Sequence, residues 1–262
     1  MARLLSALLL IPIVLGIVWF LPPIATLLLA SLAAVLCVIE YAALAAALSI
    51  PVPRPLTAIA AVAACVAVGD GLVPLELVLL GAVLSAGSLA VVSGQPGAGV
   101  LPSVAASIFG VCYIGVPLGA VAAIRTLGGR EAVLLLMAAI VVSDSAQYYT
   151  GRAFGRSPLA PSISPKKTRE GAVGGVVFGT AAMILGGRLV FPGTPVLTLA
   201  LVGLVVVLLG IVGDLFESLL KRSAGVKDSS ALIPGHGGIL DRIDSWLFAG
   251  PAYYLFLRYL QA

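Results

Sequence analysis

The sequence predicts an all-α, polytopic integral membrane protein with about nine transmembrane helices. Of its 262 residues, 61% are hydrophobic and only 10% are charged, whereas a soluble globular chain carries about 25% charged residues. Too little polar surface remains to cover a sphere of this size, which excludes an ordinary soluble enzyme, a disordered chain and a nucleic-acid-binding module. The apolar runs are continuous rather than alternating, so the backbone groups are expected to be satisfied within helices.

Nine stretches are apolar enough to be interpreted as membrane helices, each near the roughly 20 residues that a spanning helix needs. The third is short, and the first follows Arg3 but has no small-residue cleavage site soon after it, so we expect it to be retained. In chain order they run approximately over 4–20, 23–49, 56–69, 72–92, 101–124, 132–149, 171–187, 195–213 and 245–260.

The basic residues predict the orientation of these helices. If the N-terminus lies in the cytoplasm and the spans alternate, every Lys and Arg faces the cytoplasm except Arg125, Arg130, Arg188 and Arg258. Cytoplasmic loops of membrane proteins are enriched in Lys and Arg. We therefore expect an N-in, C-out topology, and the net charge of +4 then requires no nucleic-acid partner.

The charged residues also suggest two functional parts. Residues 1–130 are almost bare of charge and are interpreted as transmembrane helices that form a scaffold and give access to lipid. Most charged residues lie in two windows, 144–170 and 214–244, both on the predicted cytoplasmic side. Residues 131–262 are therefore predicted to combine transmembrane helices with the cytoplasmic loops of a polar site.

The first polar motif, Ser-Pro-Lys-Lys-Thr-Arg-Glu-Gly at 164–171, stands directly before a predicted helix. The free N–H groups and the dipole at a helix N-terminus favour anions, and Lys166, Lys167 and Arg169 would complete a phosphate cradle. A positive-inside anchor in which Thr168 caps the helix explains the same residues, and the motif alone does not decide between the two.

The second motif places Asp214, Glu217, Ser218 and Lys221 at spacings that share one helical face. Asp214 follows a long apolar run, so it is expected at or just inside the membrane boundary. Ionisable residues at that depth are costly and usually functional. The alternative is an interfacial Asp214 that pairs with Lys221.

The third motif is Pro-Gly-His-Gly-Gly at 234–238, followed by Asp241 and Asp244. Its glycines are expected to form a mobile loop that can approach a ligand's phosphates closely. Asp241 and Asp244 lie three residues apart at the start of the last helix. Together with Asp214 they suggest a hard cation such as Mg²⁺, completed by water and substrate phosphate. Capping by Asp241 with an Asp–Arg surface pair is the alternative.

Residues 218–244 resemble the signature of the phosphatidate cytidylyltransferases (CDP-diacylglycerol synthases) at Ser218, Lys221, Arg222, Lys227, Asp228, Pro234, His236, Gly237, Gly238, Asp241, Arg242 and Asp244. Upstream, Asp144, Tyr148, residues 151–155 and the motif at 164–171 are also similar to that family. Gln147 stands where alanine is common and Arg169 where tryptophan is expected, which affects details of nucleotide or lipid contact. The first half resembles the family only as a set of apolar spans.

The resemblance implies a membrane nucleotidyltransferase of phospholipid biosynthesis that converts CTP and phosphatidate into CDP-diacylglycerol and pyrophosphate. We assign Asp214 and Asp241 to Mg²⁺, with a second ion suggested by the family. The assigned catalytic residues are Lys221, Arg222, Lys227, Asp228 and Asp244. The assigned substrate-binding residues are Asp144, Ser164, Lys166, Lys167, Thr168, His236, Gly237, Gly238 and Arg242.

Phosphatidate stays in the bilayer and CTP is cytosolic, so the site is expected at the cytoplasmic face of the cell (inner) membrane. Two alternatives stay open within the enzyme class, a CDP-archaeol synthase and a polyprenol kinase, because the signature does not report the lipid chains. An anion transporter would place charges near the midplane of two repeats, whereas these charges cluster at one face. Gly171, Gly175 and Gly179 permit a homodimer without requiring one.

Overall fold

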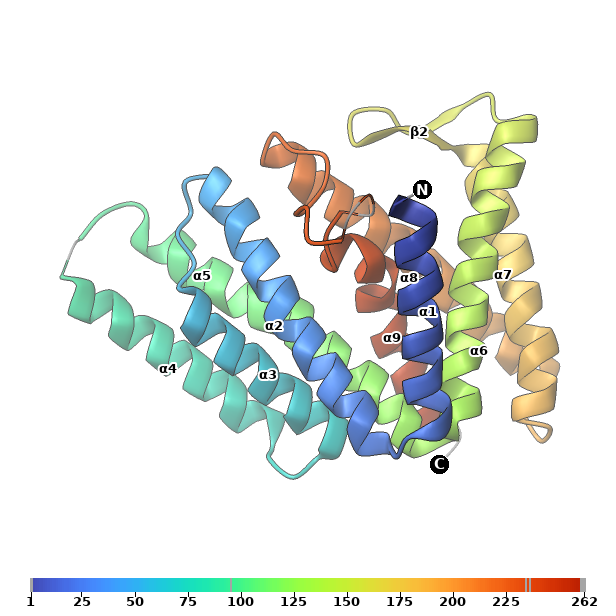
Figure 1. Cartoon of the computed structure of the whole chain (residues 1–262), viewed down its shortest axis with the longest axis horizontal. Coiled ribbons are helices and arrows are strands. Elements are labelled where there is room, and N and C mark those ends of the chain that lie inside the picture. The colour runs from blue at the N-terminus through green and yellow to red at the C-terminus, as the bar shows by residue number, and fades with distance from the viewer. Residues whose placement is uncertain (1, 95, 234, 236, 260–262) are drawn as a thin grey trace. The chain divides into compact units, whose positions relative to one another are not determined.

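A computed structural model describes residues 2–94, 96–233, 235 and 237–259, and helices dominate it (Figure 1). The chain divides into two compact units, described separately below. The first unit comprises Met1–Ala123 and Leu220–Ile243, and the second comprises Ile124–Leu219 and Asp244–Ala262. The boundaries fall inside α6 (Val116–Phe154), α8 (Val196–Ser223) and α9 (Leu240–Tyr259).

The first unit contains α1 (Ala2–Phe20), α2 (Pro23–Ala47), α3 (Arg54–Asp70), α4 (Leu75–Ser93) and α5 (Val100–Gly110). A π-helical segment, Val111–Gly115, then leads into the start of α6 (Val116–Phe154). Prolines mark the helix starts because their fixed φ suits the first turn and their missing N–H is not needed there. Gly71 and Gly94 end α3 and α4 with φ of 74° and 62°, a conformation that favours glycine.

Small residues let the helices of the first unit approach closely. Helix α3 contacts α2, α4 and the π-helical segment, and Ala61, Ala64 and Cys65 on α3 are fully buried. A Cβ on Gly115 would lie 2.8 Å from the Cα of Ala61, so only glycine fits there. The backbones are in near contact, as in other small-residue helix interfaces.

The second unit contains the rest of α6, a β-hairpin, α7 (Arg169–Val190), most of α8 (Val196–Ser223) and most of α9 (Leu240–Tyr259). Its antiparallel hairpin joins β1 (Pro158–Ala160) to β2 (Ser164–Thr168). We expected a cytoplasmic loop without strands between the spans at 132–149 and 171–187. Pro158 and Pro165 disfavour a helix in the residues before them, so the segment is extended.

The glycines of α7 pack against α6 and α8. A Cβ on Gly171 would lie 2.7 Å from the carbonyl oxygen of Gln147, and one on Gly179 would lie 2.7 Å from Val207 Cγ2. Because these glycines face neighbours within the same chain, they supply no argument for a homodimer.

The structure confirms a nearly all-α chain with several helices that could cross a membrane. In the described part of the chain, 5 helices are long and apolar enough: Pro23–Ala47, Leu75–Ser93, Val100–Phe154, Arg169–Val190 and Val196–Ser223. Val100–Phe154 includes two of the expected spans, 101–124 and 132–149. Gly129, with φ 77° and ψ −177°, interrupts the helix between them.

Gly179→Ala is expected to lower the free energy of unfolding by about 1–3 kcal/mol, because the added methyl group forces Val207 and Ser143 to move. Thermal unfolding in detergent measures this change. Gly193→Ala is the matched control, since a Cβ there has nothing within 4 Å. Equal melting temperatures for the two variants would contradict the proposed packing.

Candidate active site in two polar clusters

The basic motif at 164–171 forms strand β2 and the first turn of α7. The Thr168 hydroxyl accepts a hydrogen bond from the backbone N–H of Gly171 at 3.1 Å, so the predicted cap is confirmed. The Glu170 carboxylate accepts the backbone N–H groups of Arg156 at 3.1 Å and Ser157 at 3.2 Å. These bonds tie both ends of the hairpin to the N-terminus of α7.

In the second unit, Asp144, Gln147, Lys167, Asp214 and Asp244 form what we call the Asp214 cluster. Lys167 on β2 makes an ion pair with Asp214 on α8, and both side chains are about one quarter exposed, at 23% and 27%. Gln147 donates a hydrogen bond to Asp144 Oδ1 at 3.0 Å. Gln147 therefore orients the carboxylate of Asp144.

Close packing of α8 and α9 brings Asp214 and Asp244 together. A Cβ on Gly213 would lie 2.6 Å from the carbonyl oxygen of Asp244, so the residue before Asp214 has to be glycine. Burial raises the pKa of the Asp244 carboxyl to about 7, and the negative charges of Asp214 and Asp144 act in the same direction. Three carboxylates thus interact with each other and with one lysine.

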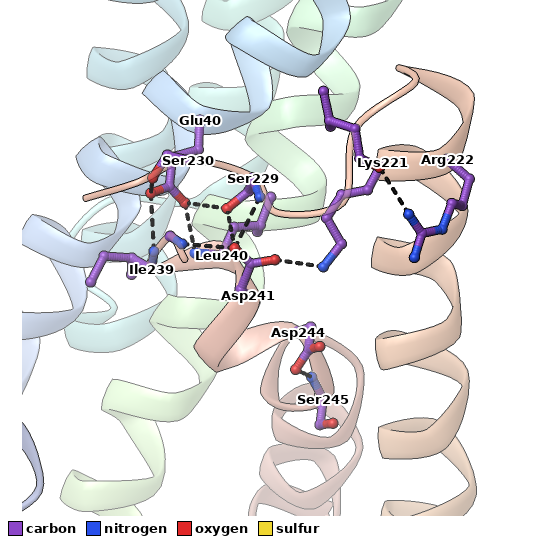
Figure 2. A network of polar contacts seen from close by, with 12 residues as sticks. Glu40, Lys221, Arg222, Ser229, Ser230, Ile239, Leu240, Asp241, Asp244 and Ser245 are labelled. Carbon is purple, nitrogen blue, oxygen red and sulfur yellow. Dashed lines mark hydrogen bonds and ion pairs between the residues drawn. The ribbon is translucent and has the colours of Figure 1, made fainter. Parts of the chain in front are cut away.

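In the first unit, Glu40, Lys221, Ser229 and Asp241 (Figure 2) lie together with Gly238 in what we call the Glu40 cluster. Asp241 Oδ1 accepts a hydrogen bond from Lys221 Nζ at 2.5 Å, and these side chains are only 4% and 12% exposed. Asp241 Oδ2 accepts the backbone N–H of Gly238 at 2.7 Å and that of Ser229 at 2.9 Å. Asp241 therefore binds Lys221 and also closes the loop that precedes α9.

Glu40 reaches this loop from the middle of α2. Its carboxylate accepts hydrogen bonds from Ser229, Ser230, Ile239 and Leu240. We did not predict this role from the sequence, although one signal was available. A lone acidic residue inside an apolar span is costly unless it has partners, so it deserved a functional interpretation.

Hydrogen bonds join described residues of the loop before α9, and its expected mobility stays a prediction. Ile233 donates its N–H to the Gly237 carbonyl oxygen at 2.8 Å. Gly235 and Gly237 both have φ of 78°, which favours glycine. A Cβ on Gly238 would collide with Ser229 Oγ and the Glu40 carboxylate. Close approach explains this glycine better than flexibility does.

The remaining predicted residues differ in exposure and position. Ser164 and Thr168 are half-buried, whereas the side chains of Lys166, Arg222, Lys227, Asp228 and Arg242 are exposed. The Arg222 guanidinium donates to the Val226 carbonyl oxygen at 3.2 Å. Predicted substrate contact at His236 lies outside the described residues.

The predicted metal ligands Asp214 and Asp241 belong to different compact units, so their joint role stays a prediction. Among residues 2–94, 96–233, 235 and 237–259, no three His, Cys, Asp or Glu side chains are arranged to hold one metal ion. The ion pairs instead give each of the two aspartates a lysine, Lys167 for Asp214 and Lys221 for Asp241.

A model of the cytidylyltransferase family matches residues 1–260, and the chain belongs to this family. It is 49% identical over 131 residues to chloroplastic phosphatidate cytidylyltransferase 5 of Arabidopsis thaliana, covering 50% of this chain and 32% of that protein. It is 42% identical over 124 residues to the Aquifex aeolicus phosphatidate cytidylyltransferase, covering 47% of this chain and 46% of that protein.

A third relative is the uncharacterized Escherichia coli protein YnbB, which is 45% identical over 132 residues. The match covers 50% of this chain and 44% of that protein. The chain thus spans less than half the length of each of these three relatives. Two of the three carry the same enzyme name.

Lys221→Met is expected to destabilise the protein by about 3 kcal/mol, because Asp241 would keep a buried charge without this ammonium partner. Denaturation in detergent measures the change. Lys227→Met removes the same charge from an exposed position of the same loop region and is expected to cost less than about 0.5 kcal/mol. Similar losses in both variants would show that the buried pair has no special contribution.

Proposed function

We propose that this protein converts CTP and phosphatidate into CDP-diacylglycerol and pyrophosphate. Membership of the cytidylyltransferase family is the observation that carries the proposal. The relatives named phosphatidate cytidylyltransferase support the choice of lipid. The two polar clusters support the chemistry, because they supply paired carboxylates and lysines within an otherwise apolar chain.

The proposed reaction needs charge neutralisation more than it needs a base. A phosphate oxygen of phosphatidate forms a bond to the α-phosphorus of CTP, and the bond to pyrophosphate breaks. The attacking phosphate monoester is already largely ionised at neutral pH, since its second pKa is about 6. The main difficulty is to bring two polyanions together, which positioned cations overcome.

Basic residues of this chain fit that requirement. Lys166 is exposed on β2, the strand that also carries Lys167 of the Asp214 cluster. Lys227 is exposed after α8, the helix that carries Lys221 of the Glu40 cluster. We assign both lysines to substrate phosphates, together with Arg222. Lys167 and Lys221 are held by carboxylates, so their ammonium groups are oriented before substrate binds. Pre-oriented charges stabilise developing negative charge without reorganisation.

We also propose a Mg²⁺ requirement, with Asp214 and Asp241 as ligands and Asp244 as a further contributor. The chemistry of these side chains supports it, since Mg²⁺ prefers hard oxygen ligands such as carboxylates, and Asp214 and Asp244 lie near enough for their charges to interact. When bound, the ion would neutralise triphosphate charge. Lys167 and Lys221 would then share their carboxylates with the ion.

We further propose nine spans with an N-in, C-out topology and a site that faces the cytoplasm of the inner membrane. The 5 candidate spans and the break at Gly129 support the span count in part. The concentration of basic residues in the two polar windows supports the orientation.

The activity is tested with purified protein, labelled CTP and phosphatidate in detergent micelles. A lipid-soluble cytidine product that forms only with Mg²⁺ is the expected result, and its absence would overturn the proposal. An isoprenoid phosphate offered in place of phosphatidate separates the lipid specificities.

Asp214→Asn and Asp241→Asn keep shape and remove charge, so each is expected to lower activity at limiting Mg²⁺. Wild-type rates in either variant would remove that residue from the metal site.

The topology is tested by labelling single cysteines in cells after Cys37, Cys65 and Cys112 have been replaced by serine. Gly193→Cys lies in the turn between α7 and α8, and Lys227→Cys lies after α8. A membrane-impermeant maleimide is expected to label position 193 in intact cells and position 227 only after permeabilisation. The reverse pattern would contradict the N-in, C-out orientation.

A further inference from the structure

Glu40 is a buried carboxylate that the proposed reaction does not use. It lies in α2, one of the candidate membrane spans, and only 4% of the residue is exposed. An ionised carboxylate in apolar surroundings costs several kcal/mol unless hydrogen bonds or charges compensate it. The groups that donate hydrogen bonds to Glu40 therefore indicate which part of the chain it stabilises.

Within the described residues, Glu40 accepts four hydrogen bonds, and all of them come from the segment that contains the glycine loop (Figure 2). Oε1 accepts from Ser230 Oγ at 2.6 Å and from the Ile239 N–H at 3.0 Å. Oε2 accepts from Ser229 Oγ at 3.1 Å and from the Leu240 N–H at 2.8 Å. One side chain thus joins the two ends of the loop and satisfies two N–H groups at the start of α9.

The same loop positions Asp241. Ser229 and Gly238 donate their backbone N–H groups to Asp241 Oδ2, and each lies next to a residue that Glu40 holds. The Ser229 hydroxyl lies within hydrogen-bond distance of both carboxylates, 3.1 Å from Glu40 Oε2 and 2.8 Å from Asp241 Oδ2. A displacement of the loop would therefore move the carboxylate to which Lys221 binds.

We infer that Glu40 is a positioning residue, which holds the loop at 229–240 so that Asp241 and Lys221 have a fixed geometry for the phosphates of the nucleotide. The inference rests on the proposed function for its catalytic consequence. Its structural part, the anchoring of the loop by α2, stands on the hydrogen bonds alone. The apolar first half of the chain then contributes a residue to the site, beyond lipid access.

Glutamine cannot replace Glu40 in this arrangement. Each carboxylate oxygen accepts one hydroxyl and one backbone N–H. Whichever way a glutamine amide is turned, its NH₂ group meets the N–H of either Ile239 or Leu240. A hydroxyl can reverse its role from donor to acceptor, but a backbone N–H cannot. Glu40→Gln therefore leaves two donors facing each other in a buried place.

The test combines hydrogen–deuterium exchange with steady-state kinetics, both on the full-length protein in detergent. Glu40→Gln is expected to speed amide exchange in 229–242 and to lower kcat/KM for CTP, per folded molecule, on the order of 10²-fold. Ser107→Ala is the matched control. It removes another buried hydrogen bond of the first unit, to the Ser103 carbonyl oxygen, away from the loop.

Three outcomes decide the inference. Local loss of protection in Glu40→Gln, absent from Ser107→Ala, together with reduced kcat/KM, supports it. Wild-type exchange of 229–242 overturns it, and so does faster exchange throughout the unit with normal activity per folded molecule. The exchange measurement needs no substrate, so failure of the proposed reaction would be seen separately as an inactive wild-type protein.

A second variant keeps the inference testable if Glu40→Gln does not fold. Gly238→Ala keeps the Glu40 side chain, but its methyl group collides with the Glu40 carboxylate and Ser229 Oγ. It is expected to loosen 229–242 in the same way. Gly225→Ala, in the same unit with nothing within 4 Å of a Cβ, controls for a glycine substitution outside the contact, although its φ of +72° adds local strain. Equal exchange in the two glycine variants would overturn the anchoring.

Discussion

The cost of placing carboxylates in an apolar chain is the constraint on which this structure depends. Few charges are available along the apolar helices, so each buried acid needs partners from the chain itself. Glu40 takes two hydroxyls and two backbone N–H groups, and Asp241 takes Lys221 together with the loop. Asp241, which the proposed reaction requires, therefore also holds the loop before α9 through hydrogen bonds to its backbone.

The clusters also depend on glycine, because their polar groups can make contact only where two backbone segments approach closely. Gly213 lets α9 approach α8 beside Asp214, and Gly238 leaves room for the Glu40 carboxylate. In both places the side chain that glycine lacks would occupy the position of a polar group. Packing and chemistry are consequently coupled, and substitutions that appear to concern only packing are expected to affect the site.

Some of the local geometry of the candidate site could be predicted from the sequence, for identifiable reasons. Thr168 precedes a helix in a recognisable capping position, and the N-cap bond to Gly171 is present. Asp241 stands out within the motif at 234–244, and it lies at the centre of the Glu40 cluster. Glu40 itself was missed because it lies about two hundred residues from its partners and belongs to no local motif. The hairpin was missed because its short strands carry no alternating pattern.

By itself, the sequence determined that this is a membrane-type chain, that it is helical, and that its charged groups gather in two windows. Those properties follow from composition and local periodicity, which need no long-range contact. Only the tertiary structure decided which charges are partners, as in the pairing of Lys167 with Asp214 and the anchoring of the last loop by Glu40. Pairing depends on which helices pack together, and that is set by contacts between residues far apart in the chain.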